Sequence, residues 1–589
     1  MSTVDAQLQI LREQEAARRE SWPAGIPRAV EYVNGERPLS DYLRWRGRIN
    51  ADKPAVHFYG RDLTFGRLDQ ESDAVAAYLI GNGLARGDRV ALMMQNCPQY
   101  VVAYWGVIRA GAVVVPLNPM FKAAEVRQQL VDSGATVAIV QADYAALIDA
   151  VRPQTDLALV VGLHIADYAG ADSAMRTPFS TEPAADPGGV DAMWPAVVAT
   201  PTAGVTLPAP ELDATAALNY TGGTTGRPKG CEHTQGTMLY TAAASATVRR
   251  TFETGADTSD SVSLSYLPVF WIAGENIAVI QPVYTGATCV LLTRWDAKAV
   301  LAAIDRFGVH GMSGTVDNYL ELMDDPEIVV RDLSSLRSPS TMSFVTKLTP
   351  LIRQQWRDRA GPHSVLREGS YGMTETHTSD TFVVGFQNDD FDLLGEPTFV
   401  GLPVPGTEIK VCDFETGEVL PSNVGGEILV RTPSLMKGYW RNPEATAECI
   451  SDGWFRTGDL GAIRDDGCLR YIGRRKEMLK VNGMSVFPTE LESLLVEHPA
   501  LAAVAVVGVA DRERGERPRA YVELNGRRET SPEELTEWAR AHVAGYKVPE
   551  FVIIDELPRT ATGKVRKVDL LELPTPSSVA TAARAAGTS

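Results

Sequence analysis

The sequence predicts an α/β fold in which a large layered N-terminal region is followed by a small α+β domain. Between residues 51 and 150, helical and strand-like patterns alternate, which is typical of a largely parallel sheet covered by helices. From about residue 477 the pattern changes to a compact unit of about 100 residues with its own strands and helices. The chain has 589 residues, enough for about four structural units, so several hydrophobic cores can form without disulfides or metal ions.

Apolar periodicity identifies the elements of the first region. Residues 1–30 predict a charged helix followed by an extended arm that contains prolines. Residues 71–88 predict an amphipathic helix that ends at glycine. Three short apolar runs predict strands: residues 89–96, 111–119 and 135–143. The stretch from about 170 to 213 is rich in Pro, Ala and Gly and predicts a long surface loop or internal linker.

The second half of the chain contains shorter, glycine-punctuated elements. Residues 424–432 and 467–473 predict antiparallel strands. In the C-terminal unit two helices are predicted, at residues 489–499 and 531–543, and two strands, at residues 501–511 and 517–524. Residues 551–560 close the unit. The second helix begins at Ser531-Pro532, with Glu533 and Glu534 in its first turn, which is a helix-start pattern. Residues 572–589 have few bulky apolar side chains and predict a disordered tail.

Composition excludes several classes of function. The net charge is −18, from 56 basic and 74 acidic side chains, which argues against a nucleic-acid partner and against a strongly anionic membrane surface. The longest apolar run is about ten residues, Leu501 to Ala510, whereas a membrane span needs about 20, so no integral membrane association is expected. Residues 1–20 lack the apolar core of a secretory signal. None of the six cysteines forms a CxxC pair, which favours reduced thiols in a cytoplasmic protein.

The strongest local signal is the run Tyr-Thr-Gly-Gly-Thr-Thr-Gly-Arg-Pro-Lys-Gly at residues 220–230. Its glycines let backbone N–H groups approach an oxyanion closely, and its hydroxyls and lysine add hydrogen-bond donors and positive charge. The spacing differs from the GxxxxGK[ST] pattern of a P-loop. The run therefore predicts a loop that binds a polyphosphate.

Four further motifs follow in a fixed order: Tyr-Gly-Met-Thr-Glu at 371–375, Trp-Phe-Arg-Thr-Gly-Asp at 454–459, Gly-Arg-Arg-Lys-Glu at 473–477 and Thr-Ala-Thr-Gly-Lys at 560–564. With them, residues 35–570 or so resemble the adenylate-forming superfamily of acyl-CoA synthetases, peptide-synthetase adenylation domains and firefly luciferase. The resemblance implies two α/β subdomains and a small β-barrel-like subdomain in residues 1–475. It also implies a small mobile α+β C-terminal domain, residues 476–571, with residues 572–589 as a tail.

The resemblance implies a nucleotide site for ATP and AMP. Its residues are Thr221, Gly222, Gly223, Thr225, Gly226, Tyr371, Gly372, Met373, Thr374, Asp459 and Arg474. Asp459 would accept hydrogen bonds from both ribose hydroxyls, as one carboxylate can. Glu375 and Thr224 would hold Mg²⁺, and Lys229 would add charge at the phosphates.

The C-terminal residues are assigned in the same way. By resemblance, Lys476 is the pivot of a domain rotation, and Lys480, Asn482 and Gly483 form a loop against coenzyme A. Lys564 would approach the substrate carboxylate and the α-phosphate, where a point cation offsets the charge of the transition state.

The acyl pocket is where the chain departs from the family pattern. Its residues by analogy are Trp271, Ala273, Gly274, Glu275, Phe344 and Val345. Trp271 replaces a His that many relatives carry, and Glu275 is unexpected beside an apolar pocket. Phe344-Val345-Thr346 stands where relatives have a turn of small residues that packs against adenine. Ala273 opens space and Phe344 closes it elsewhere, which favours a bulky or polycyclic acid over a straight chain.

The resulting hypothesis is an ATP-dependent carboxylate–CoA ligase that acts through an acyl-adenylate, with domain rotation between its half-reactions. One alternative is an enzyme that makes only the thioester from a preformed acyl-adenylate supplied by a separate adenylating enzyme, because the segment at Phe344 is altered. A second is an adenylation enzyme that loads a separate carrier protein. A luciferase-like oxygenase and an inactive scaffold complete the alternatives, since a fold does not determine function. A homodimer is the expected oligomer.

Overall fold

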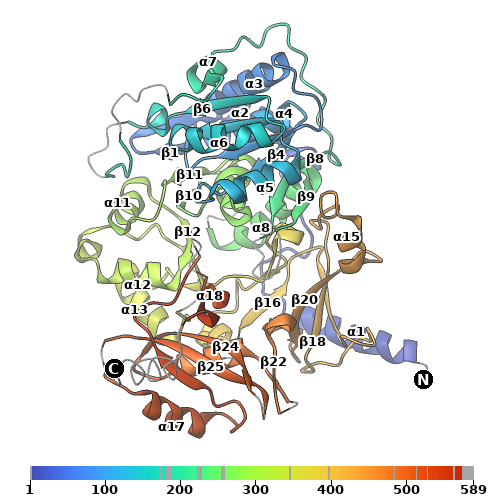
Figure 1. Ribbon diagram of the computed structural model, residues 1–589, viewed down its shortest axis with the longest axis vertical. Coiled ribbons are helices and arrows are strands. Elements are labelled where there is room, and N and C mark those ends of the chain that lie inside the picture. Colours follow the sequence, from blue (N-terminus) through green and yellow to red (C-terminus); the bar gives the residue numbers. More distant parts are fainter. Residues whose placement is uncertain are drawn as a thin grey trace, which may run out of the picture.

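The computed structural model describes residues 3–170, 175–180, 187–221, 228–253, 259–343, 346–394, 398–482, 484–511, 514–526, 528–560 and 564–573, without the side chains of residues 3, 4, 250–253 and 485. Within these residues the chain forms four sheets. Three of them belong to a large body, and the fourth forms a smaller body beneath it (Figure 1).

The first sheet has seven strands in the order β7-β6-β5-β3-β4-β8-β9. They are β3 (Arg89–Met93), β4 (Val113–Pro116), β5 (Val137–Gln141), β6 (Leu159–Leu163), β7 (Ala192–Met193), β8 (Thr215–Tyr220) and β9 (Gly230–Thr234). All neighbouring pairs are parallel except β8 and β9. The helices of this region are α3 (Phe65–Gly81), α4 (Pro98–Arg109), α5 (Ala123–Ser133), α6 (Ala145–Val151) and α7 (Trp194–Val198). The predicted parallel sheet is therefore confirmed.

One prediction for this region is wrong. The stretch from about 170 to 213 was expected to be loop, yet β7 and α7 lie within it. Trp194 explains the helix, because its side chain is 1% exposed and anchors the segment in the core, where its indole N–H donates to the hydroxyl of Tyr168. Tertiary burial here outweighs the turn-rich composition.

The second sheet also has seven strands, in the order β14-β13-β12-β10-β11-β1-β2. They are β1 (Pro54–Phe58), β2 (Arg61–Thr64), β10 (Val262–Ser265), β11 (Thr288–Leu291), β12 (Gly311–Thr315), β13 (Ser338–Met342) and β14 (Arg367–Glu368). Its helices are α2 (Leu39–Ile49), α8 (Gln235–Glu253), α9 (Ile272–Glu275), α10 (Gln281–Thr285), α11 (Ala297–Phe307), α12 (Val316–Asp324) and α13 (Pro350–Ala360), with a π-helical turn, η4 (Asn276–Ile280), between α9 and α10. One continuous hydrophobic cluster joins the first two sheets.

The third sheet is antiparallel, in the order β15-β16-β21-β20-β18-β17. It consists of β15 (Thr381–Phe382), β16 (Phe399–Pro403), β17 (Glu408–Cys412), β18 (Gly426–Arg431), β20 (Trp454–Ile463) and β21 (Leu469–Arg474), with β19 (Ile450–Ser451) beside β20 and α15 (Pro443–Cys449) before it. The path ends at β15 and β17, so in the described part of the chain this subdomain is an open sheet rather than a closed barrel.

The N-terminal helix α1 (Thr3–Ser21) is held against the third sheet (Figure 1). The Arg18 guanidinium donates to the carbonyl of Ile409 at 2.7 Å, and the Gln14 amide donates to the carbonyl of Leu420 at 3.1 Å. These bonds join the beginning of the chain to residues about 400 positions later. The helix is thus part of the large body.

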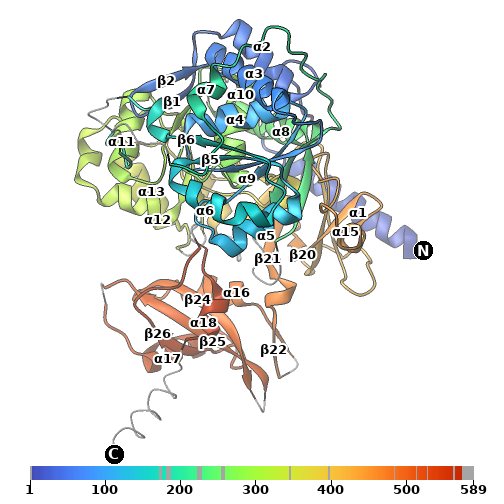
Figure 2. The same cartoon turned by 45° about the horizontal axis from the view of Figure 1, so that its top comes forward.

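The small body contains the fourth sheet, in the order β23-β22-β25-β24, with β26 beside β25. Its elements are β22 (Leu479–Val481), β23 (Met484–Val486), α16 (Pro488–Leu495), β24 (Leu501–Asp511), β25 (Gly515–Leu524), α17 (Pro532–His542), β26 (Glu550–Ile553) and α18 (Lys567–Leu571). The hydroxyl of Ser531 accepts from the backbone N–H of Glu534 at 3.2 Å, which confirms the predicted helix start. The unit has a hydrophobic cluster of its own, and in Figures 1 and 2 it lies below the large body. The predicted tail begins at residue 572, and its residues 574–589 lie outside the described residues.

Candidate active site

The phosphate-loop motif lies between β8 and β9. The backbone N–H of Thr221 donates to the carbonyl of Lys229 at 2.9 Å, and the N–H of Lys229 donates to the Thr221 hydroxyl at 3.2 Å. These two bonds bring together the ends of the segment 222–227. That segment, with Gly222, Gly223, Thr224, Thr225 and Gly226, lies outside the described residues.

Lys229 and Glu375 are brought together by one aromatic side chain. The Lys229 ammonium lies 3.8 Å from the centre of the Tyr439 ring, a cation–π contact. The Tyr439 hydroxyl donates to Glu375 Oε1 at 2.8 Å, and burial together with the Glu375 charge raises the pKa of that hydroxyl. The cation of the first motif and the carboxylate of the second therefore both contact the side chain of Tyr439.

The second motif is a tight turn after β14. A Cβ added at Gly372 would lie 1.2 Å from the carbonyl oxygen of Thr378, so this position admits only glycine. The turn continues through Met373 into the 3₁₀ turn η6 (Thr374–Thr376). Both Thr374 and Glu375 are half-buried. The packing of the turn thus explains the glycine of the motif.

Tyr371 connects this turn to the third motif. Its hydroxyl donates to Asp459 Oδ2 at 2.8 Å. Asp459 stands opposite Arg474 in the β20–β21 register, and the Arg474 Nε lies 3.2 Å from Asp459 Oδ1. Burial raises the pKa of Asp459, and the Arg474 charge opposes that shift. A buried carboxylate with one oxygen bound by Tyr371 and a cation beside the other is fixed in orientation.

The charges around Asp459 also act on Lys564, which belongs to the small domain. Its backbone N–H donates to the Thr560 hydroxyl at 3.2 Å. The residue as a whole is exposed. Burial of its ammonium among protein atoms lowers the pKa of that group, and the positive charge of Arg474 lowers it further. The negative charges of Asp459 and Glu477 raise the pKa and so oppose this shift. The Lys564 ammonium is therefore within electrostatic reach of the third motif. Residues 561–563 lie outside the described residues.

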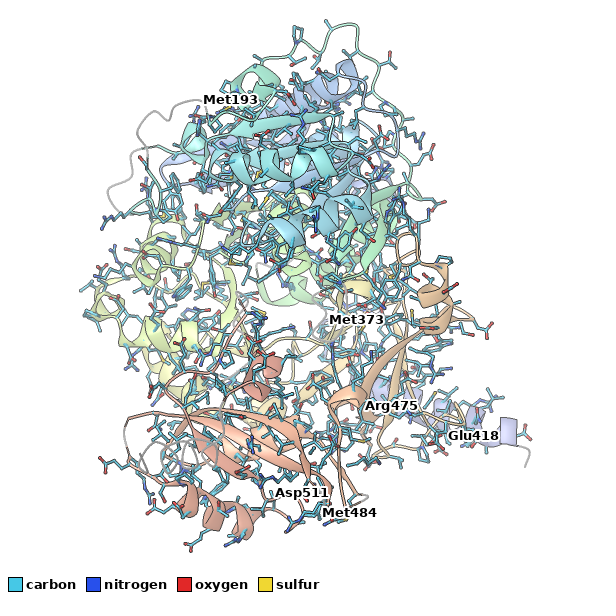
Figure 3. The ribbon with its side chains drawn as sticks, viewed as in Figure 1. Met193, Met373, Glu418, Arg475, Met484 and Asp511 are labelled. Atoms are coloured by element: carbon cyan, nitrogen blue, oxygen red, sulfur yellow. The ribbon has the colours of Figure 1, made fainter. Side chains whose placement is uncertain are left out.

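Lys476 lies at the junction of the two bodies. It is exposed, in the 3₁₀ turn η8 (Arg475–Glu477) between β21 and β22. Lys480 and Asn482 follow on the β22–β23 hairpin, where both are exposed and Asn482 has a φ of +52°. Gly483 lies outside the described residues. Figure 3 shows Met373 near the middle of the molecule and Met484, on this hairpin, at the lower edge of the small body.

Family models match both parts of the chain. Residues 43–440 match the model described as AMP-binding enzyme, and residues 490–564 match the AMP-binding enzyme C-terminal domain. The chain belongs to the adenylate-forming superfamily. Within it, the chain lies in the acyl-CoA ligase branch and is an AMP-forming acid–thiol ligase, and ATP or AMP and coenzyme A are implied by that membership. The family predicted from the motifs is thus confirmed.

Curated relatives and solved structures are similar to this chain over almost its whole length. A long-chain-fatty-acid–CoA ligase of Bacillus subtilis (strain 168) is 32% identical over 94% of this chain and 97% of its own length. An indoleacetate–CoA ligase of Aromatoleum aromaticum is 32% identical over 91% and 98%. The anthranilate CoA ligase AuaEII in complex with anthranoyl-AMP superposes with a TM-score of 0.76 at 27% identity, over 91% and 97%. Among the described residues, no helix is both long and apolar enough to cross a bilayer.

The predicted acyl segment of the ligase is a turn followed by α9. The N–H of Trp271 donates to the carbonyl of Pro268 at 3.0 Å, and its half-buried ring meets Phe270 edge-on at 5.2 Å. A Cβ at Gly274 would lie 2.1 Å from the same carbonyl oxygen, so glycine is required there too. Ala273 is half-buried, and Phe344 and Val345 lie outside the described residues.

Glu275 differs from its neighbours in this segment. Its side chain is 0% exposed and accepts hydrogen bonds from Tyr104 and Asn219. Its described partners are protein groups, which leaves no accessible atom for a ligand. Sequence reasoning missed these partners, together with His377 and His233. The only signals were the single carboxylate of Glu275 in an apolar run and, in a separate part of the chain, the histidine two residues after Glu375.

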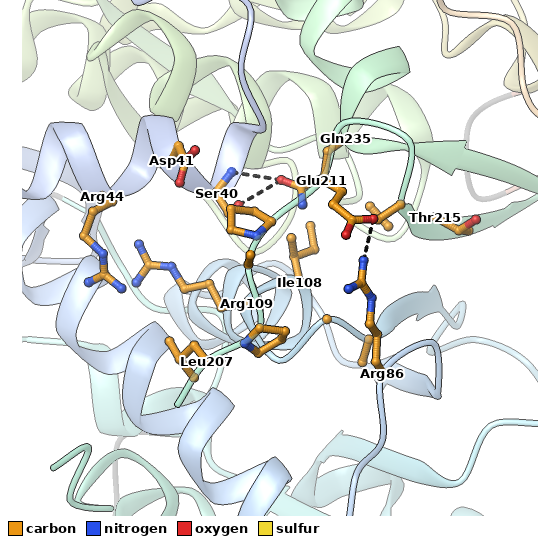
Figure 4. A pocket seen from close by; sticks show the side chains of 17 residues that line it. Ser40, Asp41, Arg44, Arg86, Ile108, Arg109, Leu207, Glu211, Thr215 and Gln235 are labelled. Atoms are coloured by element: carbon orange, nitrogen blue, oxygen red, sulfur yellow. Dashed lines mark hydrogen bonds and ion pairs between the residues drawn. The ribbon is translucent and has the colours of Figure 1, made fainter. Parts of the chain in front are cut away.

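A separate cavity of about 270 Å³ lies outside this site. It is bordered by Ser40 and Gln235, which are hydrogen-bonded at 3.0 Å, and by an ion pair of Arg86 with Glu211 (Figure 4). The cavity touches the Thr215 end of β8, whereas the phosphate loop follows the opposite end of that strand. The cavity is therefore separate from the predicted phosphate loop.

Proposed function

We propose that the enzyme converts a carboxylic acid into its CoA thioester through an acyl-adenylate, with both half-reactions on this chain. The observation that supports this best is the position of Lys564. Its ammonium is within electrostatic reach of Asp459 and Arg474, while Lys229 and Glu375 meet beside the phosphate loop. This arrangement suits the adenylation step.

In that step a carboxylate oxygen forms a bond to the α-phosphorus of ATP, and the bond from that phosphorus to the bridging oxygen breaks to release pyrophosphate. Asp459 accepts hydrogen bonds from the ribose hydroxyls and so orients the nucleotide. Lys229 neutralises charge on the phosphates, and Lys564 stabilises the charge that builds up on the attacked phosphoryl group. In the second step the CoA sulfur bonds to the acyl carbon, AMP leaves, and the thiol proton is lost to solvent.

The donor set fits Mg²⁺. Tyr439 binds only Glu375 Oε1, so Oε2 can bind a cation, and Mg²⁺ is commonly held by one carboxylate together with phosphate oxygens and water. When bound, the ion would offset the charge of the phosphates. Glu375, with Thr224, would hold it.

We also propose the domain boundary at residues 475 and 476, with Lys476 as the pivot. Lys480 and Asn482 belong to the same hairpin as Met484, which lies at the lower edge of the small body (Figure 3). A rotation about the exposed turn η8 would exchange this hairpin with Lys564. This exchange would present the loop to coenzyme A. Residues 572–589 are proposed as a tail.

For the acid we propose a bulky, rigid or polycyclic carboxylic acid. The half-buried face of Trp271 suits a flat ring, and Ala273 leaves space beside it. The relatives include ligases named for both long-chain fatty acids and indoleacetate, so the substrate panel needs both classes. Tighter binding of palmitate than of ring acids would contradict this assignment.

The decisive experiment compares two reactions of the purified protein by mass spectrometry. One contains the acid panel, ATP, Mg²⁺ and CoA, and the other contains synthetic acyl-adenylates and CoA without ATP. We expect acyl-CoA in both. Product only from the adenylates would establish a thioester-only enzyme, acyl-AMP without acyl-CoA would favour a carrier protein as acceptor, and no binding of any adenylate would establish an inactive scaffold.

Cytoplasmic location and a homodimer remain our proposals for the assembly. Fractionation of the source cells tests the first, and light scattering after size-exclusion chromatography tests the second. A monomer at micromolar concentration would contradict the dimer.

A further inference from the structure

A fully buried carboxylate connects the segments that build the nucleotide site. Glu275 is 0% exposed, at the end of α9. Its Oε1 accepts from the Tyr104 hydroxyl at 2.8 Å and its Oε2 accepts from the Asn219 amide at 2.7 Å. Asn219 belongs to β8, the strand that leads into the phosphate loop. A buried carboxylate is costly unless such partners satisfy it, so its position is tightly specified.

The same carboxylate faces His377, two residues after Glu375. His377 Nε2 lies 3.7 Å from Glu275 Oε1, and the ring is 0% exposed. On the other side of the ring, the Asn276 amide nitrogen lies 3.4 Å from His377 Nδ1, so Glu275 and Asn276 contact the two ring nitrogens of His377. His377 has a φ of +57°, in the left-handed region, and it ends the turn η6. A non-glycine residue in this conformation is held there by its surroundings.

A second histidine fastens the turn from the other side. His233 is on β9, the strand that leaves the phosphate loop, and its Nε2 donates to the carbonyl of Thr374 at 2.7 Å. Its ring meets His377 edge-on, with centroids 4.7 Å apart. Burial and the neighbouring His377 lower the pKa of His233, which keeps this ring neutral. Both strands of the phosphate loop are thus joined to the turn that carries Glu375.

The backbone at this point is also unusual. The π-helical turn η4 begins directly after Glu275, so the consecutive residues Glu275 and Asn276 are both buried, and both reach His377. Single π-helical turns occur frequently at functional sites. Here the turn places two polar side chains of the acyl segment against the nucleotide segment.

We propose that Glu275 is a positioning residue of the adenylation step. Through His377 and Asn219 it sets the position of the Thr374–Glu375 turn relative to β8, the strand that leads into the phosphate loop, and it does not bind the acyl substrate. The inference rests on the proposed function, because it needs a chain that carries out both half-reactions. Adenylation depends on the geometry of the ATP phosphates, whereas attack of CoA on a finished adenylate does not.

The test measures the half-reactions separately. Glu275→Gln keeps the volume but offers one acceptor oxygen to two donors, and Tyr104→Phe removes one of those donors. In ATP–pyrophosphate exchange we expect kcat/KM for ATP to fall about 10- to 100-fold for Glu275→Gln, and less for Tyr104→Phe, as for misplacement by a fraction of an ångström. Thioester formation from synthetic acyl-adenylate should change by less than about two-fold, as should the KM for the acid.

A double-mutant cycle and a control complete the design. Asparagine in His377→Asn can adopt the left-handed conformation but lacks the ring nitrogen Nε2. If the two side chains act together, the loss of adenylation activity in the double mutant should be no larger than that in Glu275→Gln alone. Asp392→Asn is the matched control, because Asp392 forms a buried ion pair with Arg353 and not with a residue of these motifs. Loss of this pair should destabilise the fold without selecting one half-reaction.

Three results would overturn the proposal. Equal loss of both half-reactions in Glu275→Gln, as in Asp392→Asn, would make Glu275 merely structural. A change confined to the KM or the choice of acid would make it a specificity residue. Full additivity with His377→Asn would show that the two side chains act separately. Failure of the unaltered enzyme in pyrophosphate exchange would refute the proposed function instead, which keeps the two failures distinguishable.

Discussion

The Tyr371 hydroxyl donates a 2.8 Å hydrogen bond to Asp459, so the second and third motifs share one buried contact. This bond fixes the orientation of the Asp459 carboxylate, which we propose binds the ribose, before ATP arrives. Preorganisation of this kind lowers the cost of binding, because the ordering is completed in the free protein.

Tyr371→Phe should therefore weaken nucleotide binding. Loss of one hydrogen bond to a charged group corresponds to about 1.5 kcal/mol, or roughly a ten-fold rise in the KM for ATP and the Kd for AMP. Steady-state kinetics and calorimetry measure the two constants. Tyr78→Phe, on the distant helix α3, is the control. Unchanged AMP affinity in Tyr371→Phe would contradict the role given to this bond.

Lys564→Ala should affect the half-reactions unequally. Adenylation, followed by pyrophosphate exchange, is expected to fall about 100- to 1,000-fold, because a preorganised charge at the transition state is lost. Thioester formation from synthetic acyl-adenylate should be retained. Lys298→Ala on helix α11 provides a lysine control outside the site. A comparable loss in both reactions would contradict the position assigned to Lys564.

Asp380 makes stability depend on pH. Burial raises its pKa from 3.8 to about 8, and the Thr376 hydroxyl donates to it. The folded state therefore favours the protonated acid: its contribution is complete below pH 3.8 and is lost as the pH rises to about 8. Asp380→Asn mimics the neutral form. Between pH 5 and pH 8 the wild type should lose about 1.4 kcal/mol per pH unit relative to this variant, as shown by denaturant unfolding.

The control for this pH series is Asp465→Asn, since Asp465 is exposed. That variant should follow the wild-type curve. Parallel curves for wild type and Asp380→Asn would mean that Asp380 is ionised throughout the range, against its burial.

Gly372→Ala should abolish activity and lower the melting temperature. The added methyl would meet the Thr378 carbonyl 1.2 Å away, so the turn that carries Glu375 has to move. Gly81→Ala is the matched control, because Gly81 ends helix α3 with nothing within 4 Å of the added Cβ. That change should be neutral or stabilise the fold by about 0.5–1 kcal/mol. An active Gly372→Ala variant would show that the turn has room for a Cβ at this position, contrary to the 1.2 Å separation from the Thr378 carbonyl oxygen.

Most of the fold was predictable because it depends on local patterns. The apolar runs at β3, β4 and β5 and the start of α17 at Ser531 are encoded in a few neighbouring residues. The open form of the third sheet was not predictable, because it depends on which distant strands pair along the path from β15 to β17. Helix α7 was missed because its formation depends on burial of Trp194 against distant residues, whereas the local composition is that of a loop.

The site shows the same division. Lys229, Glu375 and Asp459 stand in motifs whose residue types carry their chemistry, so the sequence identified them as candidates. The partners of Glu275 come from α4, β8 and the turn after η6, and no local pattern signals that they meet. For this reason Glu275 was assigned to the acyl pocket, whereas its contacts are with the protein interior.

The anchoring of α1 on the third sheet has a practical consequence for watching the enzyme at work. A dye on the exposed Leu8 position would stay with the large body, and a second dye at exposed Met484 would travel with the small one. The six native cysteines are free, five of them buried and Cys449 half-buried, so thiols introduced at these two positions would label preferentially. Energy transfer between the dyes would then report the proposed rotation of the small domain as a change in the distance between the two labelled positions.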